Sequence, residues 1–401
     1  MKYVLSRLRI ALNRFVIKHL KFPTPFCLVG AGSASTLCEH IAASSICKVL
    51  LVTDKGILNA TLLDPLLVQL EQQGVTVSVY SDVSPDPDYD SVLQGVQRLE
   101  NSEAAAVIAI GGGSSIDCAK AIVYTSANRR HPSALTGLWL YALPRKRGVP
   151  LYVIPTTAGT GSEVTIAAVL SDHRAQTKKA IIDPKLLPVM VALDANLTLG
   201  LPLFLTACTG MDALTHAVEA FISTMAQPET DRMARVASKL ILSNLPKVVD
   251  DGTNTALRQN MLYASCLAGM SFTRAGVGYV HAFAHQLGAL YKVPHGLANA
   301  MMLAPVLELM KHACEAKLAL LAIDANFGQV SNSDAANAEL FIAHIKWLCA
   351  ALHIPEKIQQ LQLDDIDTII GRAFSEAHGT YAVPCYLTKE QARSMLKALV
   401  V

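Results

Sequence analysis

The sequence predicts an α/β half built on a parallel sheet, followed by an all-helical half. In the first half, short runs rich in Val and Ile alternate with helical patterns, as in "KVLLVTD" (48–54) and "AAVIAIGGG" (105–113). Such alternation is typical of parallel strands whose connecting helices cover both faces of the sheet. After Pro202 the apolar residues recur at helical spacing, and strand-like runs almost disappear. The predicted segments are a basic extension (1–23), an α/β domain (24–202) and a helical domain (203–401).

Within the α/β domain, the apolar runs that end in turn or polar residues are predicted to be buried strands. The predicted strands are 48–54, 75–82, 105–113 and 150–157, and the predicted helices between them include 59–73 and 87–100.

The composition excludes several classes of protein. Of the 401 residues, 16% are charged and 52% are hydrophobic, which is enough to bury a large core. The net charge of +2 argues against a nucleic-acid partner, because phosphate neutralisation needs clustered Lys and Arg. The nine cysteines contain no C-x-x-C spacing, which favours a reduced, cytoplasmic chain. No run of eighteen uncharged apolar residues exists, so no membrane span is expected.

The N-terminal stretch "MKYVLSRLRIALNRFVIKHLKF" (1–22) carries six Lys and Arg residues and no acidic residue. Its apolar residues recur at helical spacing, which predicts a basic amphipathic helix. Such a helix can lie on a membrane surface, peripheral to the bilayer, or act as a transit sequence. The alternative is a helix packed on its own domain or on a neighbouring subunit.

Three glycine-rich loops are candidates for nucleotide binding. "VIAIGGGSSIDCAK" (107–120) is a strand, a glycine triplet and a helix start, where the backbone can approach a phosphate and free N–H groups can bind it. "IPTTAGTGSEVT" (154–165) offers several hydroxyl donors at a strand end, and "LVGAGSAS" (28–35) is an incomplete G-x-G-x-x-G. The alternative is that these are ordinary tight turns.

Asp54 ends a predicted strand, where a carboxylate can accept both hydrogen bonds of an adenosine ribose diol and would repel a 2'-phosphate. This position favours NAD over NADP. The alternative is that Asp54 is the N-cap of the next helix.

Two helical pairs in the second half suggest a metal site. Asp212 and His216 are four residues apart, as are His281 and His285, and His295 follows a proline turn. Residues at i and i+4 share one face of a helix, so each pair can point to one place. One carboxylate and two or three imidazoles suit Fe(II) or Zn(II). Taken singly, each residue has the alternative of being hydrogen-bonded or solvated without a metal.

Four motifs together resemble the iron-containing (group III) alcohol dehydrogenase family, in its order and spacing. They are "GGGSSIDCAK", "PTTAGTGSEVT", "GMDALTHAVEAF" and "HAFAHQLGALYKVPHG", and the likeness runs from residue 24 to the end. The resemblance implies a Rossmann-like nucleotide domain and a helical domain, the architecture shared with dehydroquinate synthase, with the active site in the cleft between the domains. It also implies NAD, a divalent iron or zinc, and a homodimer.

The resemblance assigns roles residue by residue. The implied metal ligands are Asp212, His216, His281 and His295, and His285 is implied to relay protons. The implied cofactor contacts are Asp54, Gly112, Gly113, Ser114, Thr156, Thr157, Thr160 and Lys178, and Phe272 is implied to lie near the substrate. Asp117 is predicted as a further cofactor contact from its position at the start of the helix that follows the glycine triplet. Two segments depart from the family pattern: Asp86-Pro87 replaces Asn-Pro, and "VPCY" (383–386) replaces Asn-Pro-Arg.

The predicted function is hydride transfer between a primary alcohol, or its aldehyde, and NAD(H) through a metal-bound alkoxide. A diol dehydrogenase of the 1,3-propanediol or lactaldehyde type is one alternative. A hydroxyacid–oxoacid transhydrogenase is another, and it needs a cationic carboxylate-binding group, for which Arg274 is the obvious candidate. A dehydroquinate synthase-like lyase would need several basic residues around the metal ligands, and these segments lack them.

Overall fold

The computed structural model describes residues 23–137, 145–173 and 177–401. The predicted N-terminal helix (1–22) therefore lies outside the described residues. Contacts within the chain define two compact units. Among the described residues, the α/β unit contains those from 23 to 201 together with 253–266, and the helical unit contains 202–252 and 267–401.

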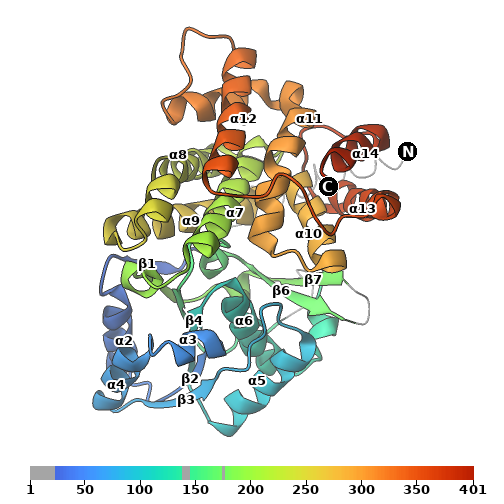
Figure 1. The fold of residues 1–401 in the computed structure, drawn as a ribbon. Coiled ribbons are helices and arrows are strands. Elements are labelled where there is room, and N and C mark those ends of the chain that lie inside the picture. Colours follow the sequence, from blue (N-terminus) through green and yellow to red (C-terminus); the bar gives the residue numbers. More distant parts are fainter. Residues whose placement is uncertain (1–22, 138–144, 174–176) are drawn as a thin grey trace. The chain divides into compact units, whose positions relative to one another are not determined.

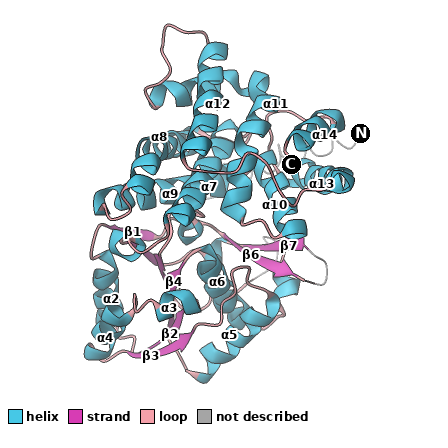
Figure 2. Cartoon of the chain, viewed as in Figure 1, coloured by secondary structure: helices cyan, strands magenta, loops and turns pink. Residues whose placement is uncertain are grey.

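The α/β unit is built on a six-stranded sheet in the order β1-β8-β5-β4-β2-β3, and all of its strands are parallel (Figures 1 and 2). Its strands are β1 (Phe26–Val29), β2 (Lys48–Val52), β3 (Thr76–Tyr80), β4 (Ala106–Gly111), β5 (Leu151–Pro155) and β8 (Met190–Leu193). Its helices are α2 (Ser33–Ala43), α3 (Lys55–Asn59), α4 (Asp64–Gln72), α5 (Tyr89–Asn101) and α6 (Gly113–Asn128). The predicted α/β fold class is confirmed.

The sheet is buried because helices cover both of its faces. All six residues of the central strand β4 are buried, as its uninterrupted apolar run "AVIAIG" predicts. Residues of α2 and α4 belong to one hydrophobic cluster with β2 and β4, and α5 and α6 pack together at the other face (Figure 1).

Strands β2 and β4 lie side by side, but the chain leaves them in opposite directions. After β2 it continues to β3 on one side, and after β4 it continues through α6 to β5 on the other side. Ligands of parallel α/β sheets bind at such a switch point, outside the carboxyl ends of the strands. Asp54 and the glycine triplet, which follow these two strands, therefore stand where a nucleotide is expected.

An antiparallel hairpin of β6 (Ala167–Asp172) and β7 (Thr177–Ile182) extends from the second glycine loop. No sequence pattern predicted this hairpin. Several of its residues alternate between exposed and buried positions, and such short strands give a weaker signal than the continuous apolar runs of the main sheet.

The helical unit consists of long helices, and the structure assigns no strand to its described residues. Its helices are α7 (Leu203–Ile222), α8 (Pro228–Asp250), the second half of α9 (Thr255–Ala275), α10 (Tyr279–Tyr291), α11 (His295–Asp324), α12 (Asp334–Ala351), α13 (Ile366–Thr380) and α14 (Lys389–Ala398). Because the first half of α9 packs with the α/β unit, the domain boundary at residue 202 stays a proposal.

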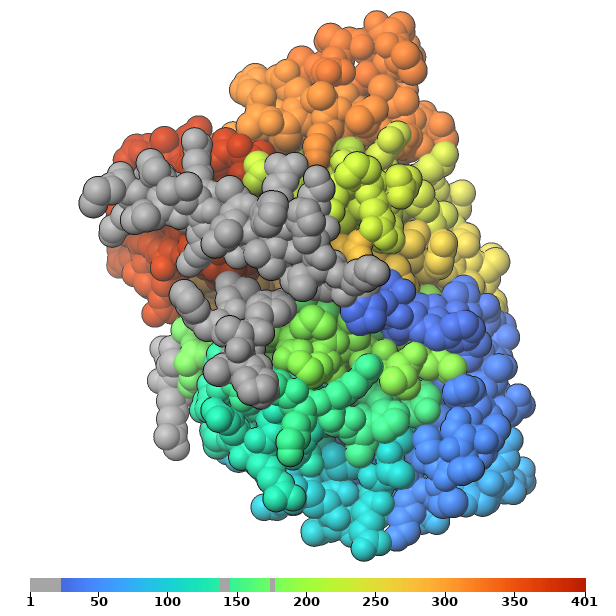
Figure 3. Space-filling model, turned by 180° about the vertical axis from the view of Figure 1, so that it is seen from behind, coloured from blue at the N-terminus to red at the C-terminus, as the bar shows by residue number. Residues whose placement is uncertain are grey.

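Helix α7 is the centre of the helical unit: nearly every residue from Thr206 to Ile222 is buried. Such burial on all sides explains why its sequence lacks a polar face. Among the described helices, none is both long and apolar enough to cross a bilayer. Helix α12 belongs to the orange part of the surface in Figure 3. Two of its apolar side chains, Leu340 and Trp347, are exposed.

Candidate active site

Four predicted metal ligands converge within the helical unit. Asp212 and His216 lie on α7, His281 lies on α10, and His295 begins α11. One donor atom from each side chain can be chosen so that all four atoms lie within 4.8 Å of one another. Three of the residues are buried, and His295 is half-buried. The structure thus brings together residues that are up to 83 positions apart in the chain, from 212 to 295.

Two glycines make this convergence sterically feasible. A Cβ on Gly296 would lie 2.6 Å from the carbonyl oxygen of Cys208, so only glycine lets the start of α11 approach α7 this closely. A Cβ on Gly278 would lie 2.7 Å from Oε1 of Glu219, at the start of α10. Each glycine therefore places a helix start, and the histidine that it carries, beside α7.

Glu219, which the sequence analysis missed, orients His281. Its Oε2 lies 2.6 Å from Nδ1 of His281, and its carboxylate also accepts the backbone N–H groups of Gly278 and Val280 at 2.8 and 2.7 Å. With Nδ1–H donating to Glu219, Nε2 is the nitrogen that keeps its lone pair for the site. The signal was present in the sequence, because Glu219 lies three residues after His216 on the same helix.

Burial sets the protonation of this pair. It lowers the pKa of His281 well below its usual range, and the neighbouring imidazoles act in the same direction. The ring is therefore the neutral form, which can bind a metal. Burial also raises the pKa of Glu219 to about 8, and hydrogen bonds from the backbone N–H groups of Gly278, Val280 and His281 act in the opposite direction.

Asn299, one turn after His295 on α11, shows where the ligand lone pairs point. Its Nδ2 lies 2.6 Å from Oδ1 of Asp212, 3.3 Å from Nε2 of His281 and 3.2 Å from Nε2 of His295. Three acceptor atoms thus face one N–H donor group, as they would face one cation. The Oδ1 of Asn299 is buried and makes no hydrogen bond.

The donor set fits a divalent transition metal. One carboxylate with three imidazoles is a combination that iron and zinc accept, whereas magnesium and calcium prefer oxygen ligands alone. A metal ligand must be deprotonated, and the neutral form of His281 meets this requirement.

His285 lies one turn after His281 and outside the four-ligand group. Its ring stacks on His295 with centroids 5.4 Å apart, and its side chain is 24% exposed. Nδ1 lies 2.6 Å from Oε1 of Glu376, on α13. Glu376 also accepts a hydrogen bond from the hydroxyl of Tyr381. Its other carboxylate oxygen accepts one from Nε2 of Gln286 at 3.1 Å. Sequence reasoning missed Glu376 because it lies 91 residues from its partner.

Phe272, predicted near the substrate, lies on α9 and stacks on His216 with ring centroids 4.2 Å apart. Arg274, two residues later, forms an ion pair with Glu229, and its side chain is only 19% exposed. A guanidinium engaged in this way is a poor candidate for capturing a substrate carboxylate.

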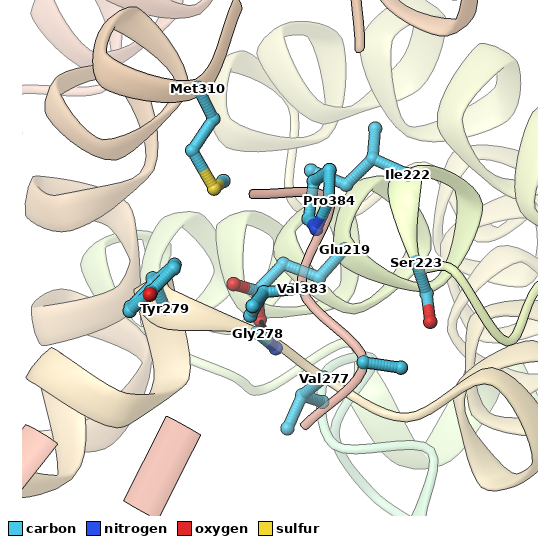
Figure 4. Close-up of a pocket in the computed structure, with 10 residues that line it drawn as sticks. Glu219, Ile222, Ser223, Val277, Gly278, Tyr279, Met310, Val383 and Pro384 are labelled. Atoms are coloured by element: carbon cyan, nitrogen blue, oxygen red, sulfur yellow. Dashed lines mark hydrogen bonds between the residues drawn. The ribbon is translucent and has the colours of Figure 1, made fainter. Parts of the chain in front are cut away.

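A small pocket lies beside Glu219 (Figure 4). Val277, Gly278 and Tyr279 line it, and Val383 and Pro384 approach Glu219 from the C-terminal segment. The "VPCY" segment, which departs from the family pattern, thus contributes to the wall behind Glu219.

The predicted nucleotide residues lie in the α/β unit. Gly112 and Gly113 follow β4, and α6 begins at Gly113. A Cβ on Gly113 would lie 2.6 Å from Cγ2 of Thr160, so the two glycine loops pack directly against each other. The N–H of Thr156 donates to the carbonyl of Gly111 at 3.0 Å, which joins the loops through the backbone as well.

Asp54 is the N-cap of α3, because its Oδ1 accepts the N–H of Ile57 at 3.0 Å. Its Oδ2 lies 3.4 Å from the hydroxyl of Ser115 at the start of α6. The capping alternative is therefore correct, and a ribose contact by the same carboxylate stays a prediction.

Asp117 and Lys178 have protein partners. The carboxylate of Asp117 accepts hydrogen bonds from the hydroxyl of Ser162 and from the N–H of Val169, the latter at 2.9 Å. Lys178, on β7, pairs with Asp86 at 2.6 Å. Asp117 is thus engaged in holding the second glycine loop, whereas Ser114 donates its hydroxyl to the carbonyl of Pro85.

Comparisons with known proteins agree with this arrangement. The family described as "Iron-containing alcohol dehydrogenase" matches residues 24–195, and the "Fe-containing alcohol dehydrogenase family, C-terminal" matches residues 206–400. Alcohol dehydrogenase 4 of Schizosaccharomyces pombe is 36% identical, over 93% of this chain and 87% of the relative. NAD-dependent methanol dehydrogenase of Bacillus methanolicus is 33% identical, over 88% of this chain and 93% of the relative. A crystal structure of 1,3-propanediol oxidoreductase superposes with a TM-score of 0.89 at 34% identity, covering 94% of this chain and 98% of the other. The chain therefore belongs to the iron-containing alcohol dehydrogenase family.

Proposed function

We propose that this enzyme oxidises primary alcohols to aldehydes with NAD, and reduces the aldehydes in the reverse direction. The convergence of Asp212, His216, His281 and His295 is the observation that carries the proposal, because three buried donors and one half-buried donor meet there in a set that suits a divalent transition metal. When bound, a divalent metal lowers the pKa of a hydroxyl group and polarises a carbonyl.

The surrounding side chains prepare the site for this chemistry. Glu219 keeps the proton of His281 on Nδ1 and so presents Nε2 to the site. Phe272, stacked on His216, provides an apolar wall for the carbon chain of the alcohol. His285, part-exposed and held by Glu376, is the candidate to carry the hydroxyl proton to solvent.

The nucleotide is proposed to bind in the α/β unit at the carboxyl ends of β2 and β4. The start of α6 at Gly113 supplies N–H donors for the pyrophosphate, and the hydroxyls of Thr156, Thr157 and Thr160 supply further donors. A carboxylate at Asp54 favours the free ribose of NAD over the 2'-phosphate of NADP.

The native metal is proposed to be Fe(II), with Zn(II) as the alternative. We expect protein purified without oxygen to contain about one divalent ion per chain and to lose alcohol oxidation when a chelator removes it. Readdition of Fe(II) or Zn(II) should restore the activity, because the ligands persist. Metal analysis with a rate assay using NAD and then NADP tests the proposal. Full turnover in the chelated protein would refute it.

A 1,3-diol is the second candidate substrate, since one structural relative is a 1,3-propanediol oxidoreductase. A series of primary alcohols and terminal diols of increasing length separates the two. A hydroxyacid–oxoacid transhydrogenase is less favoured, because Arg274 is already paired with Glu229.

Replacing Glu376 with glutamine is expected to slow alcohol oxidation by about 10- to 100-fold. A positioned proton-transfer group contributes roughly 10²- to 10⁴-fold, and the variant keeps the ring of His285 and loses only the carboxylate that holds it. Glutamine retains the shape but weakens the acceptor for Nδ1 of His285. Metal content should stay unchanged, and the loss should fall on kcat more than on KM. Glu390→Gln, an exposed position on α14, is the control. An unchanged kcat in Glu376→Gln would show that His285 works without this partner.

A cytoplasmic homodimer and a membrane-surface contact through residues 1–22 are also proposed. Size-exclusion chromatography with light scattering tests the dimer. Co-sedimentation of the full chain with anionic vesicles, compared with a chain that starts at residue 23, tests the membrane contact.

A further inference from the structure

Lys120 on α6 is a fully buried charged side chain that the proposed chemistry does not use. Its Nζ contacts five oxygen atoms, three of them backbone carbonyls and two of them hydroxyls. They are the carbonyl oxygen of Ser162, its Oγ at 3.2 Å, the carbonyl oxygen of Thr165 at 2.8 Å, its Oγ1 at 2.9 Å, and the carbonyl oxygen of Ala167 at 2.9 Å. All of these partners are uncharged and belong to the second glycine loop or to the strand that follows it.

Five neutral oxygens around one cation are an arrangement otherwise used for monovalent metal ions. Carbonyl oxygens replace the hydration shell of K⁺ in the same way. Burying a lysine is costly, and the cost is offset only when its donors are satisfied. Here three N–H donors face five acceptors, so the ammonium group is fully satisfied. Burial nevertheless lowers the pKa of Lys120 to about 8, with Asp117 and Glu163 acting in the opposite direction.

The loop depends on this cation for its conformation. The carbonyl oxygens of Ser162, Thr165 and Ala167 all point inward to Nζ. Buried carbonyl groups need partners, and here one side chain is a partner to three of them. Without it the loop would have to turn these carbonyls toward other donors.

Asp117 completes the attachment from the preceding turn of the same helix. Its carboxylate binds the Ser162 hydroxyl and the N–H of Val169, on either side of the residues that Lys120 holds. Residues 117 and 120 lie three apart, so they face the same side of α6. The helix whose first turn forms the pyrophosphate site thus also holds the second nucleotide loop.

We propose that Lys120 occupies a built-in monovalent-cation site and is the positioning residue that, with Asp117, sets the second glycine loop in its nucleotide-binding conformation. The inference concerns the shape of residues 156–167, and its effect on the cofactor rests on the proposed binding of NAD. It predicts that a free cation of suitable size can replace the lysine head group.

The test uses Lys120→Ala. This change removes three carbon atoms and the ammonium group, which together correspond to n-propylammonium, and it retains the five oxygen atoms that surround Nζ. We expect faster amide hydrogen exchange in residues 156–167, and NADH binding weakened by about tenfold or more, the effect of losing one charge-assisted interaction. Addition of n-propylammonium or K⁺ should restore exchange protection and NADH affinity in part, whereas tetramethylammonium, which is too large, should not. Lys48→Ala, at an exposed lysine, is the control and should change neither quantity.

The outcomes distinguish the inference from the proposed function. Unchanged exchange and NADH affinity in Lys120→Ala, or no response to either small cation, would overturn the inference while leaving alcohol oxidation by the wild-type chain intact. A second outcome is a wild-type chain that protects residues 156–167 from exchange but does not bind NADH, together with a Lys120→Ala variant that loses this protection. It would support the role of Lys120 in holding the loop and would refute the proposed cofactor. If Lys120→Ala does not fold, Ser162→Ala removes one contact to Lys120 and one to Asp117. It should show the same faster exchange without a response to cations, and unchanged exchange there would overturn the inference.

Discussion

Replacing His281 with alanine is expected to remove the bound metal and to lower alcohol oxidation by more than about 100-fold. Loss of a side chain that only orients a metal ligand lowers metal affinity or activity by up to about 100-fold, and loss of the ligand itself should cost more. His281 is buried and neutral, and Glu219 orients its ring so that Nε2 is presented to the site. Loss of this ring leaves three ligands and also leaves the carboxylate of Glu219 without one of its donors.

Metal content by elemental analysis and NADH formation by absorbance measure the two effects separately. His312→Ala, at an exposed histidine on α11, is the matched control and should retain both metal and turnover. NADH affinity should be unchanged in both variants, because the nucleotide residues belong to the α/β unit. A His281→Ala enzyme with a full complement of metal and normal turnover would show that the four-residue site is not the metal site.

The parts of the molecule that sequence alone predicted are those with a local signal. The strand β4 and its glycine triplet are visible because a continuous apolar run ends in residues without Cβ. The helical pairs on α7 and α10 are visible because residues four apart share a face. Both kinds of pattern can be recognised in the sequence without knowledge of the tertiary fold.

The parts that sequence alone did not predict depend on tertiary contacts. Glu376 lies on α13, 91 residues further along the chain than its partner His285, so no local sequence pattern connects the two. No sequence motif indicates a role for Asn299. Its position among the ligand atoms depends on the close approach of α11 to α7 at Gly296. Asp117 was assigned to the nucleotide because it follows the glycine triplet, whereas its carboxylate is occupied by Ser162 and Val169.

Replacing Glu219 with glutamine is expected to weaken metal binding by about 10- to 100-fold, as loss of a group that orients a metal-binding histidine does. The carboxylate now accepts three N–H groups: those of Gly278 and Val280, and Nδ1–H of His281. A glutamine amide has one acceptor oxygen, and its NH₂ group would face donors. At least one buried N–H would then lack a partner, which costs about 1–3 kcal/mol in free energy of unfolding.

Two measurements separate the orienting role of Glu219 from a purely structural one. Chemical denaturation of the metal-free protein reports the cost of the unpaired N–H, and titration with a divalent metal reports the orientation of His281. If Glu219 orients the ligand, Glu219→Asp, which keeps a carboxyl group, should recover part of the metal affinity, whereas Glu219→Gln should not. Glu315→Gln on the surface of α11 controls for the loss of a carboxylate. Destabilisation of Glu219→Gln with undiminished metal affinity would mean that the carboxylate secures the start of α10 and that the ring of His281 is held by its own packing.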